Sequence, residues 1–363
     1  MPGESLVSVA NTAFCVDLAP RLADGNLFFS PLSIESALAM TMAGADGETL
    51  KEMMAALRLE FPEKDIDAGF AILFSLINPT SPPAERGYAL NIANAIYASK
   101  DYEWKQAFID KVRDLYRSEV QSCDFFNNSE GVRNEINSWV EGKTNNKIKN
   151  LIAQGMLSPS TSMVLVNAIY FKGDWQTPFK KTSTVEKPFF LADGKKSNAM
   201  LMQRSGEITL YEEKLFNAVY LPYAKNEVGM VVILPNAPME GMPNPGALPD
   251  VEKALTADKL MAITRSLSSG WGEGIAEYDT IVNLAIPRFR VETEYGLNEP
   301  LISMGIKKAF SNEANFSKMT DKRTCISAVI HKAFVEVNEE GTEAAAATGV
   351  TMRACSAMMP KTQ

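Results

Sequence analysis

The sequence contains a single histidine, His331, among its 363 residues. Histidine is the commonest general base and a frequent zinc ligand, so its scarcity excludes most hydrolase mechanisms and most zinc sites. One histidine can still serve one catalytic triad, but the chain has no Gly-x-Ser-x-Gly turn to supply the nucleophile. Residues 328–337 alternate between apolar and polar side chains, as in a strand, and we expect a buried, hydrogen-bonded His331. The sequence therefore predicts a protein that is not an enzyme.

Positive charge and long apolar runs are also scarce. The chain has 36 Lys and Arg against 44 Asp and Glu, a formal net charge of -8 and a pI near 5.1. Binding to phosphate backbones needs clustered positive charge, so we expect no nucleic-acid partner. No apolar run is long enough to span a bilayer, so we expect no membrane partner. The N-terminus lacks the basic and apolar regions of a secretory signal, which predicts a cytoplasmic protein; release to the extracellular space is the alternative.

Cysteine is rare, and its spacing fits neither a metal site nor a disulfide framework. The four residues are Cys15, Cys123, Cys325 and Cys355. No Cys-x-x-Cys pair, His-Glu-x-x-His helix or phosphate-binding glycine-rich loop occurs either. We therefore expect reduced thiols, and neither a metal nor another cofactor.

The periodicity of apolar residues predicts helices in the first part of the chain and strands in the second. With 46% hydrophobic residues, the chain can bury a large core. Helical spacing occurs over 7–21, 31–42, 104–116 and 129–152. Strand-like patterns occur over 88–97, 163–171, 218–223, 229–235, 280–289 and 328–337. This order indicates an α+β fold with large mixed or antiparallel sheets.

Three segments resemble the serpins, a superfamily of serine protease inhibitors. They are Asn26-Leu-Phe-Phe-Ser-Pro-Leu-Ser-Ile34, Val166-Asn-Ala-Ile-Tyr-Phe-Lys-Gly-Asp-Trp175, and His331-Lys-Ala-Phe-Val-Glu-Val-Asn-Glu-Glu-Gly-Thr-Glu-Ala-Ala-Ala-Ala-Thr348. Shorter matches at 136–141, 221–223, 282–290, 304–306 and 314–317 extend the resemblance over nearly the whole chain. The residues of the third segment most resemble the intracellular, ovalbumin-like branch (clade B). The lack of a recognisable secretory signal agrees with that branch.

The resemblance implies one serpin domain over residues 1–363, with three β-sheets, eight or nine helices and a reactive-centre loop at about 339–363. A serpin normally continues past this loop through further strands, which this chain lacks. We therefore expect either a cleaved molecule, whose C-terminal fragment is a separate partner chain, or a truncated sequence. We expect no basic cluster for heparin on 65–77, where Asp65 and Asp67 are acidic.

The resemblance also implies an inhibitor that acts once. The target protease cleaves the loop, the freed segment enters the central sheet as a new strand, and the acylated protease is distorted before it hydrolyses the ester. The expected partner is a serine protease of the chymotrypsin, elastase or trypsin type, with a cysteine protease as a further option, and the inhibitor is expected to be a monomer. The alternative is a non-inhibitory serpin that acts as a carrier or chaperone.

The resemblance also implies a hinge, which precedes the bond that the protease cleaves (the bait bond). Its residues are Glu339, Glu340, Gly341, Thr342, Glu343, Ala344, Ala345, Ala346 and Ala347. Insertion buries alternate side chains, so they should be small and uncharged. We expect no charged or bulky residue at an inserting position, which disfavours the non-inhibitory alternative. We also expect residues 342 to about 354 to form a central strand of the main sheet.

The remaining site residues follow from the same resemblance. Ser30, Ser33, Asn167 and His331 match the shutter, a buried polar cluster under the central sheet, and Trp175 matches the breach, where the loop first enters. Ser30 and Ser33 are equally compatible with simple helix caps, and a lone Trp with plain core. Spacing along the loop gives Cys355-Ser356 as the cleaved bond, with Arg353, Met358 and Met359 as alternatives.

Overall fold

The computed structural model describes residues 6–22, 25–77, 83–191, 193, 195–236, 245–270, 272, 274–276 and 280–354. Three sheets organise these residues. The central sheet has six strands in the spatial order β10 (Phe289–Gly296), β11 (Thr324–Val337), β12 (Gly341–Ala354), β3 (Thr161–Asp174), β1 (Tyr88–Ser99) and β2 (Ser118–Cys123). The α+β class and the three sheets expected from the sequence are therefore confirmed.

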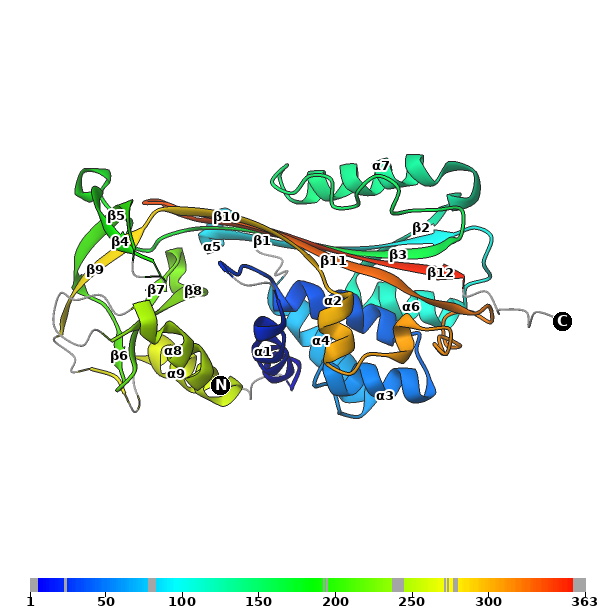
Figure 1. Ribbon diagram of the computed structural model, residues 1–363, viewed down its shortest axis with the longest axis horizontal. Coiled ribbons are helices and arrows are strands. Elements are labelled where there is room, and N and C mark those ends of the chain that lie inside the picture. Colours follow the sequence, from blue (N-terminus) through cyan, green and yellow to red (C-terminus); the bar gives the residue numbers. More distant parts are fainter. Residues whose placement is uncertain are drawn as a thin grey trace.

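Two smaller sheets lie beyond one end of the central sheet (Figure 1). One contains β4 (Val185–Phe190), β5 (Lys196–Glu207) and β9 (Ile281–Pro287), and the other contains β6 (Leu210–Glu212), β7 (Phe216–Pro222) and β8 (Gly229–Pro235). The single strand predicted over 280–289 is in fact β9 followed by the start of β10. The chain leaves one sheet at Pro287 and enters another at Phe289.

Helices cover both faces of the central sheet. In the described residues they are α1 (Leu6–Leu18), α2 (Pro31–Met42), α3 (Gly47–Ala56), α4 (Glu63–Ile77), α5 (Pro83–Arg86), α6 (Gln106–Tyr116), α7 (Phe125–Lys143), α8 (Leu248–Ala254), α9 (Ala257–Ser269) and α10 (Asn298–Ser303). Short 3-10 turns are η1 (Ala19–Arg21), η2 (Lys181–Ser183), η3 (Ala224–Asn226), η4 (Pro245–Ala247) and η5 (Lys308–Phe310). Helix α7 lies alone on one face, and α2 and α6 lie on the other (Figure 1). None of the helices in the described ranges is long and apolar enough to cross a membrane.

Local chemistry sets the limits of the two helices nearest the site. Helix α2 starts at Pro31, and the Ser30 hydroxyl accepts a hydrogen bond from the Ser33 amide at 3.2 Å. Helix α7 ends at Lys143, so the helix predicted over 129–152 is wrong in its last part. Asn145 and Asn146 adopt positive φ angles of 52° and 59°, which cannot continue a helix.

The central sheet separates two apolar cores. The larger core lies on the α2 face and includes Phe14, Leu38 and Phe70, all fully buried. The smaller core lies under α7 and includes Ile136 and Val140. Strand β12 contributes Val350 and Met352, both fully buried, to the larger core. This strand is therefore an integral part of the packed structure.

Candidate functional site

Strand β12 lies in the middle of the central sheet and pairs antiparallel with two neighbours. It pairs with β11 from Val337↔Thr342 to Thr324↔Ala354, and with β3 along its other edge. Figure 1 shows it in red between β11 and β3. The prediction that residues 342 to about 354 form a central strand is confirmed, with Gly341–Ala354 as the observed bounds.

At the entry of β12, aromatic side chains support the first inserted residues. The Tyr223 hydroxyl donates to Thr342 Oγ1 at 2.7 Å, and the Tyr223 ring stacks on Trp175 with centroids 4.7 Å apart. Trp175 Nε1 donates to the carbonyl oxygen of Asn338 at 3.0 Å. Trp175 is therefore part of the core, at 4% exposure, and it also bonds the residues just before β12, because its backbone amide donates to the carbonyl oxygen of Glu340 at 2.8 Å.

Gly341 begins the strand where space is tightest. A Cβ atom added there would lie 2.0 Å from the carbonyl oxygen of Gly173 on β3. Contacts below about 3.0 Å against backbone force the strands apart, because a carbonyl cannot rotate away like a side chain. Position 341 therefore favours glycine, because the carbonyl oxygen of Gly173 occupies the space that a Cβ atom would need.

The two glutamates before Gly341 differ in their surroundings. Glu339 is 3% exposed; its Oε1 accepts from Thr184 Oγ1 at 2.6 Å and lies 3.1 Å from Arg288 Nε. Burial acts to raise the pKa of Glu339, but the Thr184 hydrogen bond and the Arg288 charge hold it below its usual value. Glu340 is exposed and pairs with Lys181 at 2.7 Å. Glu339 is thus held as a buried carboxylate beside the entry of β12.

Glu343 corrects the expectation that no charged residue inserts. It lies within β12, and its side chain is 23% exposed. Its Oε2 is 2.8 Å from Lys147 Nζ, and its Oε1 accepts from the Tyr170 hydroxyl at 2.7 Å. The charge is tolerated because these two partners replace the water that insertion removes.

The alanines that follow are only partly described. Ala344 is half-buried and packs against the cluster that contains Trp175 and Val335. The backbone of Ala345, Ala346 and Ala347 belongs to β12, but their side chains lie outside what the structure describes. Among the described side chains of β12, those of Val350 and Met352 lie on the α2 face, and that of Glu343 contacts Lys147 on the α7 face, as strand alternation requires.

Further along β12, Thr348 lies in a buried polar cluster on the α2 face. The Ser30 amide donates to His331 Nε2 at 3.0 Å, so this nitrogen is unprotonated and Nδ1 carries the proton. His331 Nδ1 lies 2.9 Å from Thr348 Oγ1 and donates to it. Thr348 Oγ1 in turn lies 2.9 Å from Ser33 Oγ. The cluster thus joins α2, β11 and β12. Along it, each side chain accepts one hydrogen bond and donates the next.

The same chain of hydrogen bonds continues into β3 and β1. Ser33 Oγ donates to Asn167 Oδ1 at 2.6 Å, and Asn167 Nδ2 donates to Asn94 Oδ1 at 2.5 Å. Asn94 Nδ2 donates to the carbonyl oxygen of Tyr116 at the end of α6. The structure therefore brings together all four residues that the sequence assigned to the shutter. Ser30 is also the N-cap of α2, as the alternative interpretation of that residue predicted.

His331 is fully buried, and burial lowers its pKa to about 3. It therefore stays neutral at physiological pH. Its two ring nitrogens already contact the Ser30 amide and Thr348. The expectation of a buried, hydrogen-bonded core histidine is therefore confirmed.

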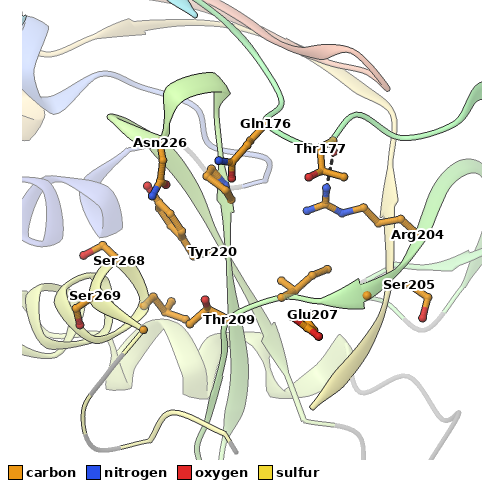
Figure 2. Close-up of a pocket in the computed structure, with 15 residues that line it drawn as sticks. Gln176, Thr177, Arg204, Ser205, Glu207, Thr209, Tyr220, Asn226, Ser268 and Ser269 are labelled. Carbon is orange, nitrogen blue, oxygen red and sulfur yellow. Dashed lines mark hydrogen bonds between the residues drawn. The ribbon is translucent and has the colours of Figure 1, made fainter. Parts of the chain in front are cut away.

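A separate cavity of about 350 Å³ lies between β5, the connection that follows it, β7 and the end of α9 (Figure 2). Arg204 projects into it and donates to the carbonyl oxygen of Thr177. Its described lining is rich in hydroxyl and amide groups, including Gln176 and Tyr220, and contains neither histidine nor cysteine. The lining also includes one carboxylate, Glu207.

The residues proposed for the cleaved bond fall mostly beyond the described part. Cys355, Ser356, Met358 and Met359 lie outside the described residues. Arg353 lies in β12, exposed, with Cys325 and Thr161 as its register partners. Arg353 therefore lies inside the strand, one residue before its observed end at Ala354.

The cysteines differ from the expectation in one respect. Cys15 and Cys123 are free thiols, and burial raises the pKa of each to about 11. Cys325 is disulfide-bonded, so the prediction of reduced thiols is wrong for this residue.

Several functional contacts were missed by sequence reasoning. Tyr223, Lys147 and Tyr170 were not assigned to the site, although each bonds a residue of β12. Thr348 enters the sequence argument only as the last residue of the segment 331–348. Its even-numbered position, two strand repeats beyond Ala344, was the signal that it faces the same side as Ser33.

Comparison with known proteins gives a consistent match. The family model described as "Serpin (serine protease inhibitor)" matches residues 9–363. The leukocyte elastase inhibitor of Bos taurus is 39% identical over 350 residues, covering 94% of this chain and 88% of that protein. Serpin B4 of Homo sapiens is 36% identical over 367 residues, covering 95% and 89%.

Solved structures agree with the sequence matches. Ovalbumin from emu (Dromaius novaehollandiae) has a TM-score of 0.87 at 29% identity, over 98% of this chain and 92% of that chain. A structure titled "Cleaved Serpin 42Da" has a TM-score of 0.85 at 32% identity, over 97% and 91%. The similarity thus extends from sequence to fold along almost the whole chain.

Proposed function

The chain belongs to the serpin family of serine protease inhibitors, in the ovalbumin-type branch (clade B), and we propose that Cys355-Ser356 is the bond that its target protease attacks. Inhibition works through cleavage of the loop and its insertion into the central sheet. One observation carries this mechanism: Gly341–Ala354 pairs along both edges, with β3 and with β11. The non-inhibitory role of carrier or chaperone is not favoured by the close relatives, which include inhibitors by name.

Insertion is favourable because the strand gains partners that an exposed loop lacks. Backbone groups along β12 form ladder hydrogen bonds on two sides. Val350 and Met352 leave water, which contributes about 1.5–3 kcal/mol for each side chain fully buried. Inhibition is then a race in which insertion must finish before the protease hydrolyses its acyl bond.

The extent of β12 supports the choice of bond. The strand runs through Ala354, opposite Thr324. A cut after Arg353 would leave Ala354 on the other fragment and give a shorter inserted segment. A cut between Cys355 and Ser356 keeps the whole of β12 on one fragment. Cuts at Met358 or Met359 would also do so, but they would leave extra residues beyond the end of the strand.

The contacts of β12 support a role for each part of the site. Glu339 to Ala347 act as the hinge. Trp175, with Tyr223, receives Thr342 at the breach. Ser30, Ser33, Asn167 and His331 act as the shutter, where exchange of hydrogen-bond partners lets β3 and β11 separate without leaving a buried polar group unpaired.

The identity of Cys355 supports a particular target class. In its reduced form, Cys355 offers a medium-sized apolar side chain, which fits chymotrypsin-like and elastase-like pockets. The relatives named leukocyte elastase inhibitor have elastase as their target by name. A trypsin-like protease would use Arg353, and a cysteine protease is a further candidate. We propose a monomeric inhibitor, forming one serpin domain, that acts in the cytoplasm and keeps its own C-terminal fragment as a partner after cleavage.

Incubation of the full-length protein with elastase, chymotrypsin, trypsin and papain tests this proposal. We expect a covalent complex that survives denaturing electrophoresis with elastase or chymotrypsin, and release of a peptide that begins at Ser356. A peptide that begins at Ala354 would move the bond to Arg353. Cleavage by every protease without any stable complex would instead support the non-inhibitory role.

A further inference from the structure

Beneath α7 the structure brings a carboxylate, an ammonium group and a phenol together from three elements. Glu343 comes from β12, Lys147 from the turn after α7, and Tyr170 from β3. Lys147 Nζ and the Tyr170 hydroxyl each contact one carboxylate oxygen, at 2.8 and 2.7 Å. We propose that Lys147 and Tyr170 form a receiving site for the Glu343 carboxylate and act as positioning residues for insertion of the hinge. This rests on the insertion mechanism proposed above.

Glu343 needs such a site because its neighbours in the sheet do not balance its charge alone. Its register partners are Lys172 on β3 and Glu336 on β11. Like charges directly opposite each other destabilise a strand pair, so Glu336 offsets the benefit of Lys172. Burial acts to raise the pKa of Glu343, but Lys147 and Tyr170 keep it below its usual value. The receiving site thus keeps this half-buried carboxylate ionised.

Lys147 is held in place by the turn that ends α7. Its amide donates to the carbonyl oxygen of Thr144 at 3.0 Å, and the Thr144 hydroxyl donates to Val140 at 2.7 Å. The ammonium group lies 5.2 Å from the centroid of the Phe334 ring on β11. It therefore sits above the seam between β11 and β12, where an entering strand must pass.

Tyr170 presents its hydroxyl from β3, the strand that pairs with the other edge of β12. The side chain is 7% exposed, and burial raises its pKa to about 12, so the phenol keeps its proton and donates to Glu343. The Asn145 amide donates to the same hydroxyl at 3.5 Å. The turn after α7 thus contributes to both halves of the receiving site.

Within the described part of the chain, Lys147 forms an ion pair with Glu343 and with no other carboxylate. Glu343 reaches this place only as part of β12. The ion pair therefore forms during insertion. The stabilisation that it provides favours insertion, which is the step that competes with deacylation of the protease. Removing it should shift the outcome from trapped protease toward cleaved, inactive inhibitor.

A double-mutant cycle tests the receiving site. Lys147→Met, Glu343→Gln and the double variant are compared with Lys143→Met, a control that removes an exposed lysine of α7 paired with Glu119 at 3.2 Å. Elastase and chymotrypsin are the probes, and the readout is the number of inhibitor molecules consumed per protease trapped. Thermal unfolding of the intact and the nicked chain is the second readout.

We expect each single variant to raise the number of inhibitor molecules consumed by about fivefold, because a charge-assisted hydrogen bond is lost from the insertion step. The double variant should be no worse than either single one, and Lys143→Met should match the parent chain. The melting temperature should fall for the nicked single variants and stay unchanged for the intact ones.

Three results would overturn the assignment. Additive effects of Lys147→Met and Glu343→Gln would show that the two residues act separately. Equal losses of melting temperature in intact and nicked chains would reduce Lys147 to a general structural role. If the parent chain traps no protease and gains no stability on nicking, the insertion mechanism itself fails, and the receiving site fails with it.

Discussion

The hydroxyl of Thr348 lies 2.9 Å from Nδ1 of His331, so a residue of the bait segment completes a hydrogen-bond chain that starts at the N-terminus of α2. Without Thr348, the proton on Nδ1 would need another acceptor in a fully buried place. The inserted strand therefore contributes more than backbone pairing. It supplies the polar atom that lets β3 and β11 stand apart with His331 and Ser33 still satisfied.

This contact predicts a difference between two substitutions of Thr348. Thr348→Val keeps the shape but removes the hydroxyl, which should destabilise the nicked chain by about 1–3 kcal/mol through the unpaired groups left behind. Thr348→Ser keeps the hydroxyl and should cost less. Denaturant unfolding of the nicked proteins measures both, and equal effects of the two substitutions would argue against the contact.

The burial of His331 predicts a pH dependence. Folding lowers the pKa of His331 from 6.5 to about 3, so the unfolded chain binds a proton that the folded chain refuses. The contribution of His331 to the free energy of unfolding should therefore be greatest above pH 6.5. It should fall as the pH drops toward 3, by up to about 5 kcal/mol. Unfolding measured from pH 7 to pH 4 checks this slope, which His331→Gln should reduce.

Glu35 predicts a slope of the opposite sign. It is fully buried in α2; its Oε2 accepts from Asn11 at 2.5 Å and its Oε1 has no hydrogen-bond partner. Burial raises the pKa of Glu35 to about 8, so the folded chain keeps a proton that the unfolded chain releases above pH 4.5. The free energy of unfolding should fall as the pH rises from 4.5 through 8.

The matched test of this slope is Glu35→Gln, which keeps the hydrogen-bonding shape without a titrating group. Its stability relative to the parent chain should increase between pH 5 and pH 8. Glu103→Gln, at an exposed position, serves as the control. A Glu35→Gln variant with the parent's pH profile would mean that the carboxyl is accessible to water.

The two glycines of β12 predict opposite outcomes for the same substitution. Gly341→Ala places a Cβ atom 2.0 Å from a backbone oxygen and should destabilise the inserted form by about 1–3 kcal/mol. Gly349→Ala meets Leu151 at 3.7 Å, an ordinary contact, and should be neutral or slightly stabilising. The number of inhibitor molecules consumed per trapped protease should rise only for Gly341→Ala. A rise for both variants would mean that alanine is unsuitable anywhere in the strand.

The sequence predicted the positions of helices and strands better than it predicted which side chains contact one another. Alternation over 328–337 located β11, and Ser30 followed by Pro31 located the start of α2, because these signals depend on neighbours along the chain. The end of α7 was missed because three asparagines in the connection, Asn145, Asn146 and Asn150, were not recognised as left-handed residues.

That Ser30, Ser33, Asn167 and His331 lie together could be predicted, because the family resemblance names them as one cluster. The shutter residues were named, but Thr348 was not joined to them, because the contact depends on the register of β12 with β3. The charge of Glu343 looked absent from the inserting set because its partners, Lys147 and Tyr170, come from distant elements. Long-range pairing of this kind leaves no periodic signal in one sequence.

The most direct test of the central claim is amide hydrogen exchange over residues 341–354, measured on the intact chain and after nicking at the bait bond. The account predicts fast exchange in the intact chain and strong protection after nicking, since β3 and β11 then bond the segment on both edges. Equal exchange rates before and after nicking would contradict it.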